Sequence, residues 1–378
     1  MSWSVVKLGD VVKFIGGSQP PKSTFKYEPM EGYIRLLQIR DYKSDNNLTF
    51  IPESSTKKFC SKKDIMIGRY GPPVFQILRG LEGAYNVALM KAEPSKSVDR
   101  DYLFYFLRQD TLFRLIDGLS QRTAGQSGID MDALKSYPML LPPLDEQKRI
   151  AAILDKADAI RRKRQQAIQL ADDFLRSVFL EMFGTDLQRS TSVTTFGDVS
   201  ILDAKMVDPR EEEYLDLLHI GPDRIEKNTG KLLPALTARE EQLISKKFLF
   251  DNQYILYSKI RPYLRKVAVP DFKALCSADM YPIKPVKGKV TREFMWMLLL
   301  SDYFDNYVSS LPARANIPKL NRTELAAFKF SLPDYTKIEK FTAVVQKSHQ
   351  GTKSIKSSYV ESNNLFDALS QKAFAGEL

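Results

Sequence analysis

Cysteine and histidine are both scarce in this 378-residue chain, which has two of each. Cys60 and Cys276 lie far apart and without metal-ligand spacing, which indicates a reducing compartment and no structural disulfide. His219 and His349 are isolated in the sequence, so neither a zinc site nor a histidine-based triad is predicted. We expect His219 to be a loop or core imidazole with a satisfied partner.

Long apolar runs and catalytic signatures are also missing. The longest apolar stretch, Phe294–Leu300, is too short for a membrane span, and the N-terminus has no signal-peptide core. We therefore expect a soluble cytoplasmic protein with no membrane partner. The sequence has no G-x-x-x-x-G-K-[ST] loop, no G-x-G-x-x-G turn opening a helix and no Asn-Pro-Pro-Tyr-like stretch of adenine methyltransferases. We expect no catalytic residue, metal or cofactor on this chain.

The length and charge of the chain point to two domains and a polyanionic partner. A chain of 378 residues with 43% hydrophobic residues can bury more than one core. The net charge of +10 suits binding to nucleic acid, although a merely basic surface would give the same total.

An internal repeat organises the sequence. Residues 144–183 contain no Pro or Gly and have the heptad pattern of a helix that packs on another helix. The segment 335–375 repeats this pattern without insertion or deletion, so that Ile150 corresponds to Phe341, 191 residues later. Arg161 and Arg164 interrupt the first seam. The predicted seam residues are Ile150, Leu154, Ala157, Ile168, Leu175, Val178, Phe341, Val345, Ile355, Tyr359, Phe366 and Leu369.

The repeat continues upstream of both helices. Residues 134–142 match 325–333 as a short strand that ends at a proline, and 8–12 match 196–200. Short alternating strands and one amphipathic helix are expected in each copy, the helices at about 101–119 and 291–309. The fold class is therefore α+β, with two mixed α/β domains. The expected order is domain 1 in 1–143, a long helix in 144–184, domain 2 in 185–334 and a second long helix in 335–378.

The two long helices should pair with each other. A helix of about forty residues spans about 60 Å and cannot bury its seam within a small domain. An antiparallel coiled coil within the chain would give the repeat pseudo-two-fold symmetry. Because small and polar residues occupy several seam positions, we expect other subunits to pack on the helices as well.

Two basic clusters, in residues 43–79 and 246–273, are predicted to contact phosphates. Nearby loops contain Arg, Gln and Asn, which can read base edges in the major groove. Ordinary polar surface loops remain the alternative for any single residue. The predicted DNA-binding residues are Gln19, Lys22, Lys57, Lys58, Lys62, Lys63, Arg69, Arg79, Gln121, Arg122 and Gln126 in domain 1, and Lys259, Arg261, Arg265, Lys266, Arg314, Asn316 and Lys319 in domain 2.

Four segments carry a resemblance to a known family: KLGDVVKFIGG at 7–17, LPPLDEQKRIAAILDKAD at 141–158, SKIRPYLRKVA at 258–268 and QKAFAGEL at 371–378. With the repeat, they make the chain resemble the specificity subunit of type I restriction–modification systems over essentially its whole length. The resemblance implies two target recognition domains, each reading one half of a split, asymmetric site in double-stranded DNA. It also implies that the helices set the spacing of the half-sites.

The same resemblance implies partner subunits. Two modification subunits would bind S-adenosylmethionine and methylate adenine, and the helices would dock them. Whether two restriction subunits, which need ATP and Mg²⁺, also join is left open.

The sequence departs from the family pattern in two places. The second helix junction, SLPDYTKIEKF, lacks the Glu-Gln of the first, and domain 1 has GRYGPP where domain 2 has SKIRPYLRK. The half-sites should therefore differ. Two other hypotheses stay open: a coiled-coil scaffold whose domains bind only proteins, and an unfamiliar enzyme such as a nuclease.

Overall fold

The structure, a computed structural model, describes residues 3–71, 73–120, 128–202, 204–312 and 318–378. The chain divides into two compact units: unit 1 contains residues 1–163 and 359–378, and unit 2 contains residues 164–358. The long helices α5 (Leu144–Phe183) and α10 (Tyr335–Ala375) therefore each contribute one part to either unit.

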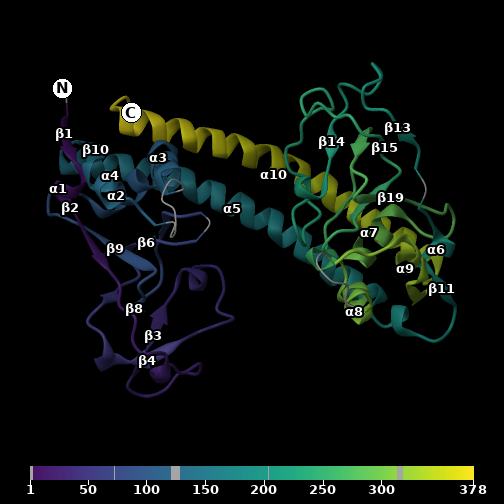
Figure 1. Cartoon of the computed structure of the whole chain (residues 1–378), viewed down its shortest axis with the longest axis horizontal. Helices are drawn as coiled ribbons and strands as arrows, with labels where there is room; N and C mark the ends of the chain where they lie inside the picture. Colours follow the sequence, from purple (N-terminus) through teal and green to yellow (C-terminus); the bar gives the residue numbers. More distant parts are fainter. Residues whose placement is uncertain (1–2, 72, 121–127, 203, 313–317) are drawn as a thin grey trace. The chain divides into compact units, whose positions relative to one another are not determined.

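The described strands of unit 1 form two four-stranded sheets and one two-stranded ribbon (Figure 1). The first sheet is antiparallel throughout, in the order β2 (Val12–Gly16), β9 (Leu89–Pro94), β6 (Ile65–Gly68) and β7 (Gln76–Leu78). The second sheet has β3 parallel to β8, in the order β4 (Phe50–Pro52), β3 (Tyr33–Leu37), β8 (Gly83–Tyr85) and β5 (Phe59–Cys60). The ribbon pairs β1 (Ser4–Lys7) with β10 (Pro138–Leu141).

Strand β6 lies between two cores of unit 1. Ile65 and Ile67 face the larger core, whereas Met66 faces a smaller core against the second sheet. Successive side chains of a strand point to opposite faces, so an unbroken apolar run marks a strand that is covered on both sides. The sequence Ile-Met-Ile thus fixes the register of the first sheet.

Unit 2 repeats this plan. Its first sheet has the order β12 (Ser200–Ile201), β19 (Met280–Pro285), β16 (Ile255–Ser258) and β17 (Val267–Ala268). Its second sheet has β14 parallel to β18, in the order β13 (Met206–Val207), β15 (Lys247–Phe250), β18 (Ala274–Cys276) and β14 (His219–Ile220). The ribbon pairs β11 (Val193–Thr195) with β20 (Lys329–Ser331). The copies differ at the edges of the second sheet, where β4 lies beside β3 but β13 lies beside β15.

The prediction of one amphipathic helix per domain is wrong, because each copy has two helices there. They are α2 (Arg100–Leu107) and α3 (Asp110–Ser120) in unit 1, and α7 (Arg292–Leu300) and α8 (Asp302–Ser310) in unit 2. Helix α7 is buried on every side from Phe294 to Leu300, whereas α8 buries only Phe304. One straight helix could not be buried on every side in its first half and exposed on most sides in its second. The helix is broken at Ser301, whose Oγ caps α8 by accepting a hydrogen bond from the Phe304 N–H at 3.3 Å.

Short helices complete both units. Helix α1 packs on α4 in unit 1, and α6 packs on α9 in unit 2. The strand expected at 134–142 begins only at Pro138, because residues up to Ser136 belong to α4. The bounds are α1 (Leu8–Val11), α4 (Met131–Ser136), α6 (Phe196–Val199) and α9 (Arg322–Ala327), with single turns at η1 (Lys22–Thr24), η2 (Ile39–Tyr42), η3 (Glu53–Ser55), η4 (Asp186–Gln188), η5 (Pro222–Arg224) and η6 (Pro262–Leu264).

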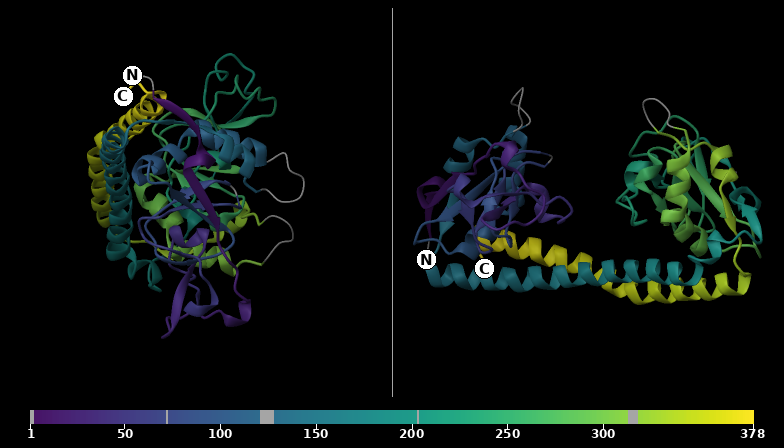
Figure 2. Two further views of the ribbon diagram at one scale, coloured as in Figure 1. Left: turned by 90° about the vertical axis from the view of Figure 1, so that its left-hand side faces the viewer. Right: turned by 90° about the horizontal axis from the view of Figure 1, so that it is seen from below.

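Helices α5 and α10 run antiparallel in each unit (Figure 2). In unit 1, Arg149 Nη2 donates to the carbonyl of Leu378, 2.8 Å away, and the Arg161 guanidinium lies 4.4 Å from the centre of the Phe366 ring. In unit 2, the rings of Phe179 and Phe341 are 5.5 Å apart. Residues later in α5 therefore contact residues earlier in α10, as antiparallel helices require. This confirms the predicted fold class of α+β domains with paired long helices.

The buried face of α5 is wider than the heptad pattern indicates. Phe179 and Phe183, which the pattern left out, are buried because they contact both Phe341 of α10 and Phe294 of α7. A helix with two partners needs a wider apolar stripe than a two-helix seam. Of the predicted seam residues, Ile150, Leu154, Ala157, Leu175, Phe341, Val345 and Phe366 are buried, while Ile168, Val178, Ile355, Tyr359 and Leu369 are partly buried.

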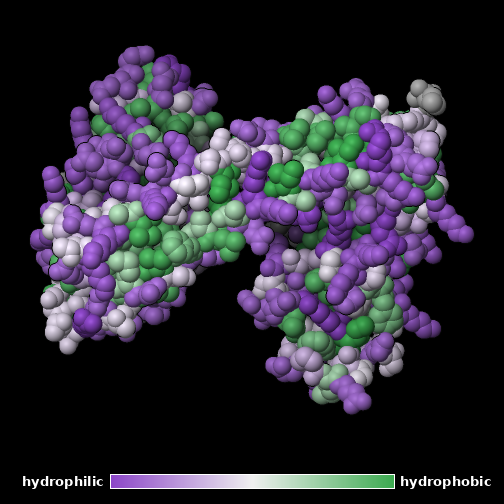
Figure 3. All heavy atoms as spheres, turned by 180° about the vertical axis from the view of Figure 1, so that it is seen from behind, coloured by the Kyte–Doolittle hydropathy of each residue, from purple (hydrophilic) through white to green (hydrophobic). Residues whose placement is uncertain are grey.

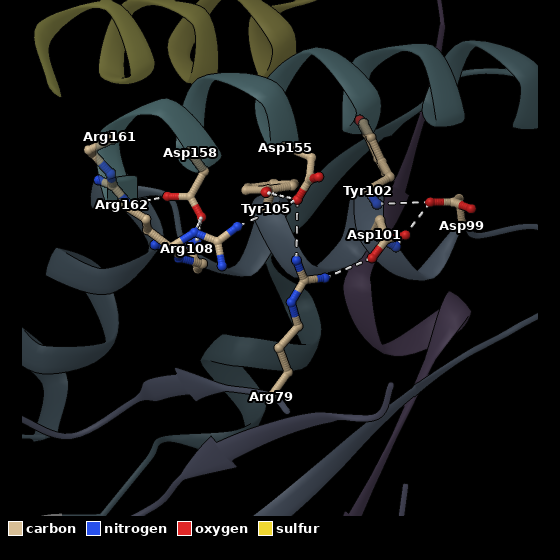
Figure 4. A network of polar contacts seen from close by, with 10 residues as sticks. All are labelled: Arg79, Asp99, Asp101, Tyr102, Tyr105, Arg108, Asp155, Asp158, Arg161 and Arg162. Carbon is tan, nitrogen blue, oxygen red and sulfur yellow. Dashed lines mark hydrogen bonds and ion pairs between the residues drawn. The ribbon is translucent and has the colours of Figure 1, made fainter. Parts of the chain in front are cut away.

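A buried carboxylate explains Arg161, one of the two arginines that interrupt the seam. Asp158 is 2% exposed and pairs with Arg161, with Arg162 Nε at 3.2 Å and with Arg108 Nη1 of unit 1 at 3.5 Å (Figure 4). Burial lowers the pKa of the Arg108 guanidinium, and the Asp158 charge opposes that shift. The carboxylate thus holds α5 to the end of α2.

A second carboxylate extends this attachment. Asp155 accepts a hydrogen bond from the Tyr105 hydroxyl at 3.0 Å and pairs with Arg79 Nη2 at 3.6 Å. Arg79 also pairs with Asp101 at 2.7 Å and stacks over Phe104, 3.8 Å from the ring centre. We call Asp155, Asp158 and their arginine and tyrosine partners the ionic joint of unit 1.

A further position of the junction is polar in unit 1 and apolar in unit 2. Gln147, which is fully buried, donates through Nε2 to the carbonyls of Ser97 and Pro142 at 2.9 and 2.8 Å and accepts from the Asp99 N–H at 2.7 Å. Its counterpart 191 residues later is Ile338, which is fully buried in the apolar core of unit 2. The missing Glu-Gln of the second junction is therefore a change from a polar to an apolar attachment.

We predict that Asp158→Ala lowers the free energy of unfolding by about 3 kcal/mol, because it leaves three guanidinium groups without their shared buried partner. Urea denaturation of the whole chain measures this change. Asp367→Ala, an exposed site on α10, is the control and should change the value by less than about 0.5 kcal/mol. Equal effects of the two substitutions would contradict the prediction.

Candidate nucleic-acid interface

Loops that connect the first sheet of unit 1 gather at one edge of it. Strands β2 and β6 end there, and β9 and β7 begin there, because all neighbours are antiparallel. Backbone bonds join these loops: Gly17 N–H donates to the Leu89 carbonyl at 3.0 Å, and Arg69 N–H donates to the Ala88 carbonyl at 2.8 Å. We call this the loop edge of unit 1.

Five of the predicted DNA-binding residues lie on or beside this loop edge. Gln19 and Lys22 are exposed on the loop that follows β2, and Arg69 follows β6. Lys57 and Lys58 are brought beside them, because Thr56 Oγ1 lies 2.6 Å from Ser18 Oγ and the Lys58 carbonyl accepts from the Tyr85 N–H at 3.2 Å.

The remaining described residues of unit 1 that were predicted to bind DNA lie at the opposite edge of the sheet. Lys62 and Lys63 precede β6, and with Arg79 they line a hollow beside the end of β9. Arg79 already pairs with Asp101 and Asp155 in the ionic joint, so the geometry favours a structural role for it. The basic cluster of residues 43–79 is thus two separate surfaces.

Unit 2 has an equivalent loop edge, where β16 ends and β17 and β19 begin. Three of its predicted DNA-binding residues are engaged inside the unit. Lys259 Nζ donates to the Ala278 carbonyl at 2.6 Å, and Lys266 Nζ donates to the Pro222 carbonyl at 2.6 Å. Arg265 pairs with Asp302 and with Asp305, both at 2.7 Å. These contacts shape the hairpin between β16 and β17.

Arg261 and Lys319 are exposed at the same edge. Ile260 and Lys319 form an antiparallel bridge, and the Arg261 N–H donates to the Pro318 carbonyl at 2.8 Å. Neither side chain has an ion-pair partner in the described part of the chain. The predicted residues Gln121, Arg122, Gln126, Arg314 and Asn316 lie outside the described residues.

Two exposed tyrosines on these hairpins were not predicted as site residues. Tyr70 is 37% exposed beside Arg69, whose guanidinium lies 5.2 Å from the ring centre. Tyr263 is 54% exposed, two residues after Arg261. Their position next to an arginine on a strand-connecting loop was the available sequence signal.

Both cysteines are buried, and His219 is engaged within unit 2. Burial raises the pKa of the Cys60 thiol to about 11 and also raises that of Cys276. His219 Nδ1 lies 2.7 Å from Glu241 Oε2. Within the described residues, no group of three or more His, Cys, Asp or Glu side chains could hold a metal ion, and no helix is long and apolar enough to cross a membrane.

Comparison with known proteins agrees with this geometry. The model of the type I restriction modification DNA specificity domain matches residues 1–170 and 223–353. The EcoDI specificity subunit of Escherichia coli is 32% identical over 187 residues, which cover 48% of this chain and 41% of that protein. The MjaVIII specificity subunit of Methanocaldococcus jannaschii is 24% identical over 358 residues, covering 88% and 82% of the two chains.

A solved structure shares the fold. The S subunit of a type I restriction–modification system from M. genitalium superimposes with a TM-score of 0.57 at 15% identity, over 99% of this chain and 96% of that one. The likeness supports the arrangement of elements alone, whereas the family match covers well over half of the sequence and reaches into both repeats. The chain belongs to the family of type I restriction–modification specificity subunits, non-catalytic proteins that recognise DNA targets.

Proposed function

We propose that this chain recognises a bipartite, asymmetric DNA site, one half with each unit, and carries two modification subunits that methylate adenine. The observation that supports this best is the pair of equivalent loop edges. Each lies at the same end of the equivalent four-stranded sheet and carries cationic side chains: the exposed Lys57 and partly exposed Lys58 in unit 1, and the exposed Arg261 and Lys319 in unit 2. Such side chains suit phosphate and base contacts in duplex DNA.

The two loop edges carry different side chains on equivalent strands, which favours unequal half-sites. The hairpin after β6 contains Arg69, Tyr70 and Gly71, whereas the hairpin after β16 contains Arg261, Pro262 and Tyr263. A change in the side chains that meet the base edges changes the preferred bases. The half-sites should lie on one face of the duplex, about 34–36 Å or one helical turn apart.

Exposed apolar residues on the long helices support the docking of partners. Phe174 of α5 and Leu365 of α10 occupy corresponding positions of the repeat and are 54% and 56% exposed. Apolar side chains also reach the surface on the face drawn in Figure 3. Two modification subunits, one per unit, would cover such residues and bring S-adenosylmethionine. Restriction subunits, where present, would bring ATP and Mg²⁺, and the whole complex would work in the cytoplasm.

The first test separates the two basic surfaces of unit 1. In the complex with the modification subunit, Lys57→Glu with Lys58→Glu should weaken DNA binding and reduce the slope of log affinity against log salt by about 1–2. Fluorescence anisotropy with a labelled duplex measures both quantities between low and physiological salt.

Lys62→Glu with Lys63→Glu is the matched control, because it makes the same charge change at the opposite edge of the sheet. It should leave the slope unchanged. If the unsubstituted complex binds with no dependence on salt, the protein-binding scaffold becomes the better hypothesis.

A second test maps methylated adenine in the host genome with the gene intact and deleted. We expect a motif of two unequal half-sites around a non-specific spacer, lost on deletion. Inserting about four residues into α5 adds about 6 Å of helix. The spacer should change by about one to two base pairs of about 3.4 Å each, with both half-sites unchanged. An unaltered spacer would rule out that the helices set the distance.

The third test counts bound partners. Phe174→Asp should remove one of two modification subunits, and Leu365→Asp should remove the other, because a buried unpaired charge opposes docking. Native mass spectrometry of the assembled complex gives the stoichiometry. Gln166→Asp, also exposed on α5, is the control and should retain both subunits.

A further inference from the structure

The hairpin between β16 and β17, residues 259–266, is fixed from inside unit 2. Arg265 bonds to Asp302 and Asp305 of α8 and, at 3.3 Å, to the Leu300 carbonyl. Lys259 and Lys266 at its two ends each donate to a backbone carbonyl at 2.6 Å. Three of the four cationic side chains of the hairpin therefore hold its shape and are not available to a partner.

The backbone of the hairpin is in an unusual conformation. Arg261 and Arg265 have φ angles of 49° and 45°, in the left-handed region that residues other than glycine seldom occupy. Such strain persists where surrounding contacts determine the conformation, and it clusters at ligand-binding positions. Here the Arg261 N–H bond to Pro318 and the Ile260–Lys319 bridge supply those contacts.

Three exposed side chains lie on or beside the fixed hairpin: an arginine, a lysine and a tyrosine. Arg261 is exposed and has no ion-pair partner among the described residues, and Lys319 lies across the bridge from Ile260. Tyr263 is 54% exposed. With Lys319 and the apolar Val308 and Leu311, it lines a hollow of about 220 Å³.

We propose that this hairpin is the base-reading element of unit 2. Arg261 donates to a guanine in the major groove, Tyr263 makes apolar contact with the adjoining base or sugar, and Lys319 contacts a phosphate. Arg265 is a positioning residue that sets the direction of Arg261. The proposal rests on the proposed function, since it assigns residues to one of its half-sites.

The different roles proposed for Arg261 and Lys319 follow from the geometry and chemistry of their side chains. A guanidinium fork reads guanine only when its direction is fixed, because two parallel hydrogen bonds must form together. The fixed left-handed backbone supplies that direction. A lysine is a point charge on a flexible stem and suits a phosphate, which carries no sequence information.

Unit 1 provides an internal control. Its equivalent hairpin also places an arginine before an exposed tyrosine, Arg69 before Tyr70. Positive φ values there fall on Gly71 and Phe75, at 92° and 61°, which correspond by strand register to Arg261 and Arg265. The two hairpins therefore share this backbone, and unit 1 has no arginine at either position. Phe75, at the position of Arg265, is buried in the apolar core and cannot form the ion pairs of Arg265. Substitution of Arg69 should therefore affect the other half-site.

The experiment uses the complex with the modification subunit and duplexes that carry the mapped motif or a single base-pair change at each position. Binding affinity gives a discrimination ratio for every position. Arg261→Lys keeps the charge but loses the fork, so discrimination at one G·C position of one half-site should fall at least about tenfold, with the salt slope unchanged. Arg265→Lys should reduce discrimination at that same position.

Lys319→Gln should weaken binding to all duplexes alike and lower the salt slope by about 1. Arg69→Lys should leave the Arg261-dependent position untouched. If the unsubstituted complex shows no sequence preference, the proposed function itself fails. If that complex discriminates and Arg261→Lys keeps full discrimination at every position, or loses it equally in both half-sites, the inference is overturned while the proposed function stands.

Discussion

The apolar seam between α5 and α10 is the constraint on which the other contacts depend. A helix of forty residues exposes far more apolar surface than one small domain can cover, so each part of α5 packs on the antiparallel part of α10 in its unit. Each helix then has a second buried face, turned towards the strands and short helices. Phe179 and Phe183 show this best, because they contact Phe341 of the partner helix and Phe294 of α7 at once. The same residues therefore bury the seam and attach the strands and short helices to the long helices.

The two units solve the attachment with different chemistry at corresponding positions. Gln147 and Asp158 of unit 1 are buried and satisfied by hydrogen bonds and ion pairs. In unit 2, Ile338 at the first position lies in the apolar core, and His349 at the second packs beside the Trp296 ring. An apolar contact tolerates small rotations, because it depends mainly on buried area. A buried carboxylate with three guanidinium partners tolerates few, because each lost partner leaves a charge without compensation. The polar joint therefore specifies orientation more narrowly than the apolar one.

The sequence predicted the features that depend on a repeating pattern of residues. It failed where contacts between residues distant in the chain decide which side chains are exposed. The heptad repeat gave the long helices and most buried seam residues, since period is a local property of the chain. It could not show that Lys58 and Lys62 belong to different surfaces, because their separation depends on the pairing of β5, which lies between them, with β8 of the second sheet. Nor could it show that Arg265 is engaged, since Asp302 and Asp305 come from another helix. Residue type and spacing identified the basic segments, while tertiary contacts decided which cations remain exposed.

Different contacts constrain the central strands and the loop edge of each unit. The central strands β6 and β16 divide their side chains between two cores, so a one-residue shift would exchange the faces of every residue in the strand. The hairpins that follow these strands are restricted mainly where they are held in place, by the burial of Phe75 in unit 1 and by the ion pairs of Arg265 in unit 2. Gly71 and Arg261 stand at the same register position and both have a positive φ, so the same backbone carries no side chain in one unit and an arginine in the other. Under the proposed function, a chain built on this plan would change the bases it prefers through the hairpin side chains, while the strand register and the seam of the long helices stay the same.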